Sequence, residues 1–258
     1  MPTPTNLYYF SHGEQNVSRP PIVLIHGAGG THLHWSPQSR RIPGQRIYAL
    51  DLPGHGKSGG LGSQSVADYA RSVVEFLDAL GFNQAVIVGH SMGSAIALTL
   101  ALDHPRRVAG LGLVGSGARL RVASAILEGS SSAETFPAVV KLINDLEFGP
   151  YVNPRMKELA AQRMLEIRPS VLHGDFSACN QFDVMARLGE IKTPTLILCG
   201  AEDQLTPVKY SEYLQSHIAG ARLVAFPGAG HMVMLEEPIA VAKELGEFVD
   251  GIKYRPGV

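Results

Sequence analysis

The chain has 258 residues, of which 45% are hydrophobic and 17% are charged, and its formal net charge is -1. This composition is typical of a compact globular protein with one large core, and the length fits a single domain. Basic and acidic residues are interspersed, so the sequence offers no long cationic surface for a nucleic acid or an anionic membrane. We expect a small-molecule partner, no nucleic acid and no membrane; the oligomeric state stays open.

Residues 1–21 contain no continuous apolar stretch of the length that a signal peptide needs, and nowhere do about 18 apolar residues run together. A cytoplasmic location is therefore the expectation. The two cysteines, Cys179 and Cys199, are too few for a disulfide framework and have no Cys/His cluster with zinc spacing around them. We expect two packed thiols, no metal and no organic cofactor.

Short apolar runs rich in β-branched residues, bounded by Gly, Pro or Asp, predict strands that are buried on both faces of a parallel sheet. Between residues 66 and 80, apolar residues recur at every third or fourth position and Gly81 follows, which predicts a helix with a C-terminal stop. Strands alternate with helical segments, so the predicted fold is α/β, a mostly parallel central sheet flanked by helices. The predicted strands are residues 21–26, 46–50, 85–89, 111–114, 195–199 and 223–226.

The alternation stops between residues 116 and 189, where about 70 residues carry helical patterns only. We interpret residues 117–188 as an inserted helical cap, and residues 1–116 together with 189–258 as the core. The apolar side chains of the cap either pack a small core of their own or line an apolar pocket over the site. They are Leu127, Phe136, Val139, Val140, Leu142, Ile143, Met156, Met164 and Phe182.

The motif Gly89-His90-Ser91-Met92-Gly93 stands between a predicted strand and a helical run. In this G-x-S-x-G pattern a serine projects its hydroxyl from a sharp strand-to-helix turn, which only small residues two positions away allow. The turn also directs the backbone N–H of Met92, at the start of the helix, toward an oxyanion. Ser91 is therefore the candidate nucleophile, although the same pattern also occurs by chance in turns without chemistry.

Two further polar residues each follow a predicted strand. Asp203 stands in the loop after residues 195–199, and His231 follows residues 223–226. Sites in open α/β sheets form at these carboxyl ends of strands. A histidine that is neutral near pH 7 can accept the proton of a serine, and an aspartate can orient it and stabilise the imidazolium that forms. Glu202 is the neighbouring alternative for the acid.

With these motifs the sequence resembles the capped single-domain serine hydrolases of the α/β-hydrolase superfamily, among them esterases and lactonases, over nearly its whole length. The chain order Ser, acid, His is the order of that fold. The resemblance implies an α/β-hydrolase fold with a mostly parallel sheet and an inserted helical cap. The matching segments are HGAGG at 26–30, DLPGHGKS at 51–58, GHSMGS at 89–94, GAEDQLTP at 200–207 and GAGHMVMLEEP at 228–238.

Carried over residue by residue, the resemblance implies a catalytic triad and an oxyanion hole. The acid falls on Asp203 rather than Glu202, because the family spacing is Gly, two residues, Asp, three residues, Pro. Gly29 is the alternative to Ala28 as an oxyanion donor. The implied residues are Ser91 as nucleophile, Asp203 as acid, His231 as base, and the backbone N–H groups of Ala28 and Met92 as oxyanion donors.

Four other residues near these motifs are expected to support the site. The resemblance implies structural roles beside the catalytic loops for His26 and His55. Asp51 is expected to bind backbone N–H groups of the loop that follows it. We expect His90 to be packed, with its side chain away from the exposed face of the turn.

The expected reaction is hydrolysis of a carboxylic ester or a lactone through an acyl-enzyme, with N-acyl homoserine lactones among the substrates that would fit an apolar cap. Haloalkane dehalogenases and epoxide hydrolases attack with Asp, so Ser91 excludes them. A carbon-carbon bond hydrolase stays open, although those enzymes usually carry Trp after the histidine and here Met232 stands there. A cofactor-free perhydrolase or haloperoxidase and a small-molecule receptor on the same fold also stay open.

A dinucleotide-binding enzyme is the strongest alternative from another class. Gly27 and Gly29 follow a predicted strand, and Asp51 ends a later one. The third glycine of that fingerprint would stand at position 32, where the chain has His32, and the residues that follow lack helical spacing. We therefore expect no nucleotide cofactor.

Overall fold

The computed structural model of the chain describes residues 7–13 and 19–253. These residues form a seven-stranded sheet with the order β1-β3-β2-β4-β5-β6-β7. β1 runs antiparallel to β3, and the other neighbouring strands run parallel to each other. The strands are Tyr9–His12 (β1), Ile22–Ile25 (β2), Ile47–Leu50 (β3), Ala85–His90 (β4), Val108–Val114 (β5), Thr195–Gly200 (β6) and Arg222–Phe226 (β7).

The predicted fold class is confirmed, and each predicted strand has a counterpart in the sheet. The prediction missed β1 and began β5 three residues late. β1 is a four-residue edge strand with side chains that are half-buried or exposed, so it lacks the apolar run of a central strand. β5 begins with Val108-Ala109-Gly110, in which two small residues dilute the apolar pattern.

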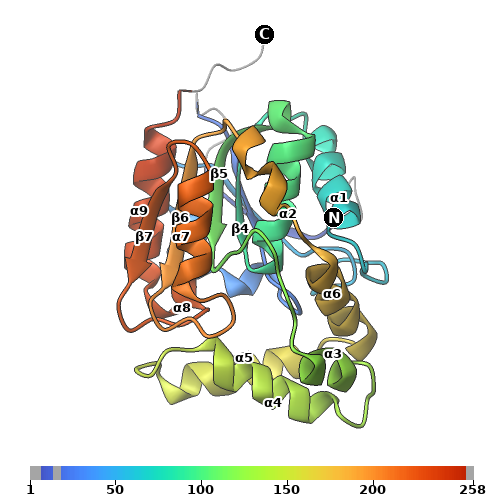
Figure 1. Cartoon of the computed structure of the whole chain (residues 1–258). Helices are drawn as coiled ribbons and strands as arrows, with labels where there is room; N and C mark the ends of the chain where they lie inside the picture. The colour runs from blue at the N-terminus through green and yellow to red at the C-terminus, as the bar shows by residue number, and fades with distance from the viewer. Residues whose placement is uncertain (1–6, 14–18, 254–258) are drawn as a thin grey trace.

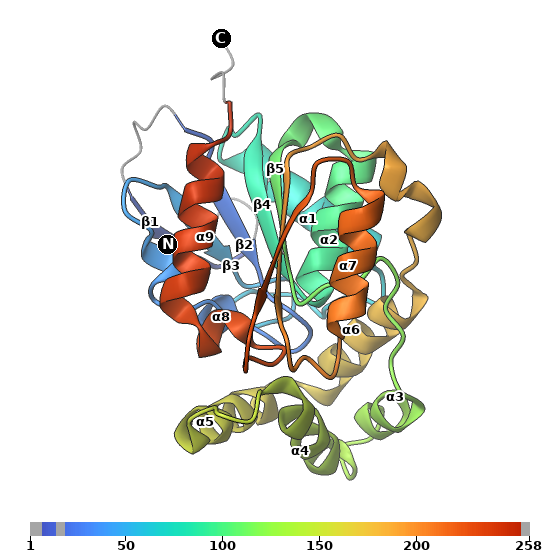
Figure 2. The ribbon, with the colours of Figure 1, turned by 60° about the vertical axis from the view of Figure 1, so that its left-hand side comes forward.

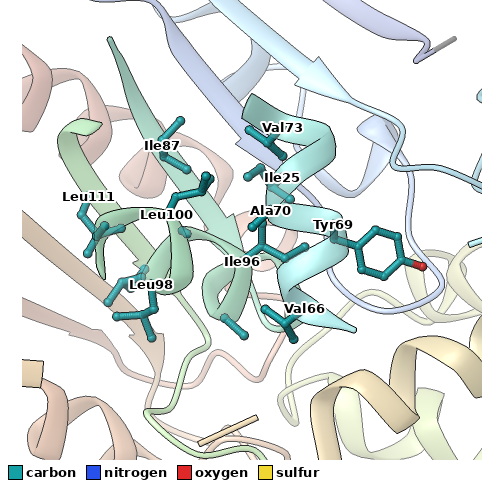
Figure 3. Close-up of a cluster of buried hydrophobic side chains, with 14 of the residues drawn as sticks. Ile25, Val66, Tyr69, Ala70, Val73, Ile87, Ile96, Leu98, Leu100 and Leu111 are labelled. Carbon is teal, nitrogen blue, oxygen red and sulfur yellow. The ribbon is translucent and has the colours of Figure 1, made fainter. Parts of the chain in front are cut away.

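Helices cover both faces of the sheet, as Figures 1 and 2 show. α1, α2 and α7 pack on one face and α8 and α9 on the other, each with its own cluster of buried side chains. Figure 3 shows part of the first cluster, where α1 and α2 meet the central strands. These helices are Val66–Ala79 (α1), Met92–Asp103 (α2), Val208–His217 (α7), Val233–Glu236 (α8) and Pro238–Asp250 (α9).

The helix α1 begins and ends close to the residues that the sequence predicts. The Ser65 side chain accepts a hydrogen bond from the Asp68 backbone N–H, which satisfies a donor that the first turn leaves free. Val66, Tyr69, Val73 and Leu77 then face the core with helical spacing. Gly81, at a φ of 67°, follows the last turn in the left-handed conformation that glycine adopts without strain.

Between β5 and β6 the chain forms further helices, which lie below the carboxyl ends of the strands in Figure 1. They enclose a small apolar cluster of their own, to which Phe136, Val139 and Met164 belong. Leu142 was expected to pack or to line a pocket, but it is 38% exposed because it lies on the outer face of its helix. The helices are Ser124–Ser130 (α3), Phe136–Glu147 (α4), Pro154–Leu165 (α5) and Pro169–Gln181 (α6).

The central strand β4 should be sensitive to the loss of a buried side chain. Ile87 is fully buried between the sheet and the helices α1 and α2, so Ile87→Ala should lower the free energy of unfolding by about 2–5 kcal/mol. Ile239, which is 74% exposed at the start of α9, is the matched control, and Ile239→Ala should change it by less than about 0.5 kcal/mol. Urea unfolding measures both, and equal effects would contradict the buried position of Ile87.

Candidate active site

Ser91 stands in a strained turn between β4 and α2. Its φ of 53° makes it the only non-glycine residue with a positive φ in residues 7–13 and 19–253. A Cβ on Gly89 would fall on the carbonyl oxygen of Gly93, and a Cβ on Gly93 would fall on that of Ile25. Strand and helix therefore approach so closely that neither glycine position accepts a side chain, and the Ser91 N–H is fixed by the Val114 carbonyl at 2.9 Å.

The loop after β2 lies against the same serine. A Cβ on Gly27 would come within 3.1 Å of Ser91 Cβ. The backbone N–H of Ala28 makes no hydrogen bond within the described chain, and Met92 is the first residue of α2, where the N–H has no partner in the helix. The Gly29 N–H instead donates to Asp175 Oδ2 at 2.8 Å, so it is not available to an oxyanion.

His231 and Asp203 meet at the carboxyl ends of β7 and β6. Nδ1 of His231 lies 2.8 Å from Asp203 Oδ2, and both side chains are buried. Asp203 also accepts hydrogen bonds from the Leu205 N–H, the Thr206 N–H and the Thr206 hydroxyl. With the proton of His231 on Nδ1, facing the carboxylate, Nε2 is left as the proton acceptor.

The pair is electrostatically suited to proton transfer. Burial disfavours the carboxylate of Asp203, but the neighbouring His231 and the bonds from Thr206 outweigh it and hold the pKa of Asp203 below its usual value. Burial also disfavours the imidazolium of His231, and here Asp203 outweighs it and raises the pKa of His231 above its usual value. Asp203 is therefore ionised near pH 7 and stabilises a proton taken up by His231.

His231 is also held from its other side. Nε2 of His90 donates to the His231 carbonyl at 3.0 Å, and the two ring centroids are 4.7 Å apart. Burial lowers the pKa of His90, so this ring is neutral and packed, as the sequence predicts. Within the described chain, Ser91 Oγ and His231 make no hydrogen bond with each other; such contacts are often long before a substrate binds.

A buried carboxylate on α6 connects the helices between β5 and β6 to the loop that carries Ala28. Asp175 is fully buried and accepts hydrogen bonds from the Gly29 N–H and from His55 Nε2, both at 2.8 Å, and from the Tyr69 hydroxyl at 2.7 Å. Burial disfavours a charged His55, but Asp175 outweighs it and raises the pKa of His55. No local motif marks Asp175 in the sequence, and its position next to the loop of Ala28 and Gly29 emerges only from the fold.

His26 and Asp51 have the structural roles expected of them. His26 accepts a hydrogen bond from the Leu52 N–H at 3.0 Å and donates through Nδ1 to the Gly27 carbonyl. The Asp51 carboxylate accepts from the backbone N–H groups of His32 and Lys57. These bonds fix the loops on either side of the site.

The described part of the chain contains no group of three or more His, Cys, Asp or Glu side chains that could hold a metal ion. It also contains no helix that is long and apolar enough to cross a membrane. Cys179 and Cys199 are both buried and free.

The chain is similar to known hydrolases along most of its length. Residues 20–238 match the family model described as alpha/beta hydrolase fold. The chain is 32% identical to 2-hydroxymuconate semialdehyde hydrolase of Pseudomonas sp. strain CF600, over 89% of this chain and 86% of that one. It is 29% identical to pimeloyl-[acyl-carrier protein] methyl ester esterase of Neisseria meningitidis serogroup C, over 90% and 94%. A solved thermophilic esterase has a TM-score of 0.81 and 34% identity, covering 96% of this chain and 100% of that one.

Breaking the buried pair of Asp175 and His55 should destabilise the protein. Asp175→Ala removes the shared acceptor of three buried donors, on His55, Tyr69 and Gly29, so the free energy of unfolding should fall by about 3–5 kcal/mol. Asp183, whose half-exposed carboxylate lies near two arginines, gives the matched control, and Asp183→Ala should cost about 0–1 kcal/mol. Urea unfolding distinguishes them; a similar small cost for both would show that the Asp175 pair contributes nothing to stability.

Proposed function

The chain belongs to the alpha/beta hydrolase fold family, and on that premise we propose that it is a serine hydrolase that cleaves carboxylic esters or lactones. Ser91 is the nucleophile, His231 the base and Asp203 the orienting acid. The observation that carries the proposal is the buried His231–Asp203 pair at 2.8 Å, in the layer of strand ends that also holds Ser91 on its strained turn. The family match gives the fold, and ester or lactone hydrolysis is the proposed reaction class.

The first half of the reaction forms an acyl-enzyme. Ser91 Oγ attacks the carbonyl carbon of the substrate while its proton moves to Nε2 of His231. The carbonyl oxygen becomes an oxyanion, which accepts hydrogen bonds from the N–H groups of Ala28 and Met92. His231 then gives the proton to the leaving alcohol oxygen, the bond from that oxygen to the carbonyl carbon breaks, and the acyl group stays on Ser91.

The second half releases the acid. His231 takes a proton from a water molecule, whose oxygen attacks the acyl carbonyl. The bond to Ser91 Oγ breaks as His231 returns the proton to it, and Asp203 stabilises the imidazolium in both halves. No step requires a metal or an organic cofactor.

The apolar side chains of the helices between β5 and β6 favour an apolar substrate. A Cβ on Gly29 would come within 2.6 Å of Leu172 Cδ1 and 3.8 Å of Met164 Cγ, so apolar side chains of α6 and α5 lie over the oxyanion loop. We propose residues 117–188 as a cap that binds an acyl chain or an alicyclic group beside the carbonyl. N-acyl homoserine lactones belong to this substrate range. A small-molecule substrate and a cytoplasmic location complete the proposal.

The relatives favour ester cleavage and also one second candidate. The methyl ester esterase of Neisseria and the thermophilic esterase are named for esters. The relative from Pseudomonas is named a semialdehyde hydrolase, which supports carbon-carbon bond hydrolysis as the alternative. Both reactions need a serine and a histidine, and they differ in the bond of the substrate that is cleaved, carbon-oxygen or carbon-carbon.

Removal of the nucleophile should abolish hydrolysis. Ser91→Ala should lower turnover by about three or more orders of magnitude, because no other group is placed to form the acyl-enzyme. The assay is a panel of p-nitrophenyl esters of rising chain length, aryl esters, γ-lactones and acyl homoserine lactones. Ser216→Ala, at an exposed serine on α7, should leave the rates unchanged. Near-normal hydrolysis by a folded Ser91→Ala protein would contradict the proposal.

The pH dependence should report His231 as the base. Only the neutral imidazole accepts the serine proton, and Asp203 raises the pKa of His231, so kcat/KM should rise with pH and reach half its plateau above 6.5. Asp203→Asn should lower kcat/KM and move that midpoint to lower pH, because the stabilising charge is lost. Initial rates on one p-nitrophenyl ester give both profiles. A flat wild-type profile from about pH 5 to pH 8 argues against His231.

A further inference from the structure

A pocket of about 400 Å³ lies next to the loop that carries His231. Its wall is largely apolar and includes Met164 of α5 and Met232, the residue after His231. Met232 is tied to the insertion, because its backbone N–H donates to the carbonyl of Glu147 at 3.0 Å. The pocket is thus bounded by the loop of the catalytic histidine and by the helices of the insertion.

One wall residue of this pocket is a buried carboxyl group that the reaction above does not use. Glu147, at the end of α4, is only 6% exposed and its carboxyl oxygens accept no hydrogen bond within the described chain. Burial raises the pKa of Glu147 to about 7. The carboxyl oxygens of Glu147 are not sealed from the pocket, so a ligand in the pocket can supply the donor that the protein does not.

The charges around the pocket restrict the kind of donor. Arg40, Arg155 and Arg163 line it and are half-buried or exposed. His34 also lines it, and burial lowers the pKa of His34 to about 4, so that ring is neutral. His231 does not line the pocket, but Glu147 contributes to the raised pKa of His231. Three guanidinium groups disfavour an ammonium ligand, which leaves an uncharged donor such as a hydroxyl or an amide N–H.

The position of the pocket assigns it to one half of the substrate. His231 gives its proton to the departing alcohol oxygen, so the alcohol leaves on the His231 side of the carbonyl, and Met232, the residue after His231, lines the pocket. We propose that this pocket binds the alcohol portion of the substrate and that Glu147 accepts a hydrogen bond from a hydroxyl or amide N–H on that portion. The inference rests on the proposed ester hydrolysis and names its substrate class: esters of alcohols with a second hydrogen-bond donor.

Matched butyrate esters test this assignment. Each ω-hydroxyalkyl butyrate is compared with the alkyl butyrate of equal length: 2-hydroxyethyl with propyl, 3-hydroxypropyl with butyl, and 4-hydroxybutyl with pentyl. All form the same butyryl-enzyme, so a difference in kcat/KM arises before that intermediate. The wild type should prefer the hydroxy ester by about tenfold for at least one length, as expected for one hydrogen bond to a carboxylate.

Variants of Glu147 identify the acceptor. Glu147→Met keeps the length of the side chain and should bring the preference for the hydroxy ester close to one. Glu147→Gln retains a carbonyl oxygen and should keep a reduced preference. Glu134→Met, at an exposed glutamate of the same insertion, should leave the preference unchanged.

The outcomes separate this inference from the proposed function. An equal preference in the wild type and in Glu147→Met, or no preference at any length, overturns the role of Glu147 while hydrolysis still depends on Ser91. Hydrolysis of the series by Ser91→Ala at the wild-type rate would instead overturn the serine mechanism. If Glu147→Met does not fold, an undiminished preference in Glu147→Gln is the contradicting result.

Discussion

The close approach of β4 and α2 at Ser91 is the constraint on which the rest of the site depends. A residue with a side chain is held at a φ of 53° because two glycines let the strand and the helix nearly touch. The bond from the Ser91 N–H to the Val114 carbonyl fixes this turn to the neighbouring strand. The same compact turn leaves the first N–H of α2 free and brings the loop of Gly27 against the serine, so one backbone arrangement positions both the proposed nucleophile and the proposed oxyanion donors.

Three buried carboxyl groups near the site differ in the hydrogen-bond donors that face their oxygens. Asp203 accepts several hydrogen bonds and faces His231, which keeps it ionised. Asp175 accepts hydrogen bonds from His55, Tyr69 and the Gly29 N–H, and so links α6 to the loop that carries Ala28. Glu147 has no donor from the described chain, and burial raises its pKa. In the proposed mechanism Asp203 orients the base, Asp175 holds a loop, and Glu147 accepts a hydrogen bond from the substrate.

The site residues that could be predicted from the sequence are those that directly follow a predicted strand. Ser91, Asp203 and His231 each follow an apolar strand, so the parallel sheet brings them to one edge, and the structure places Asp203 and His231 in contact. Asp175 and Glu147 lie in helices without a motif, and the partners of Asp175 are 106 to 146 residues away in the chain. Their environment depends on how the insertion packs on the core, which helical periodicity does not specify. The edge strand β1 was not predicted, because its side chains are half-buried or exposed and form no apolar run.

The central claim is that Ser91 is a nucleophile activated by His231, and covalent labelling tests it most directly. The protein is treated with a fluorophosphonate, which reacts with activated serines to give a stable phosphonyl ester, and the modified residue is located by mass spectrometry of peptides. The account predicts a single adduct on the peptide that contains Ser91, absent from Ser91→Ala and much slower to form in His231→Ala. An adduct on another residue, or none while the protein still hydrolyses esters, would contradict it.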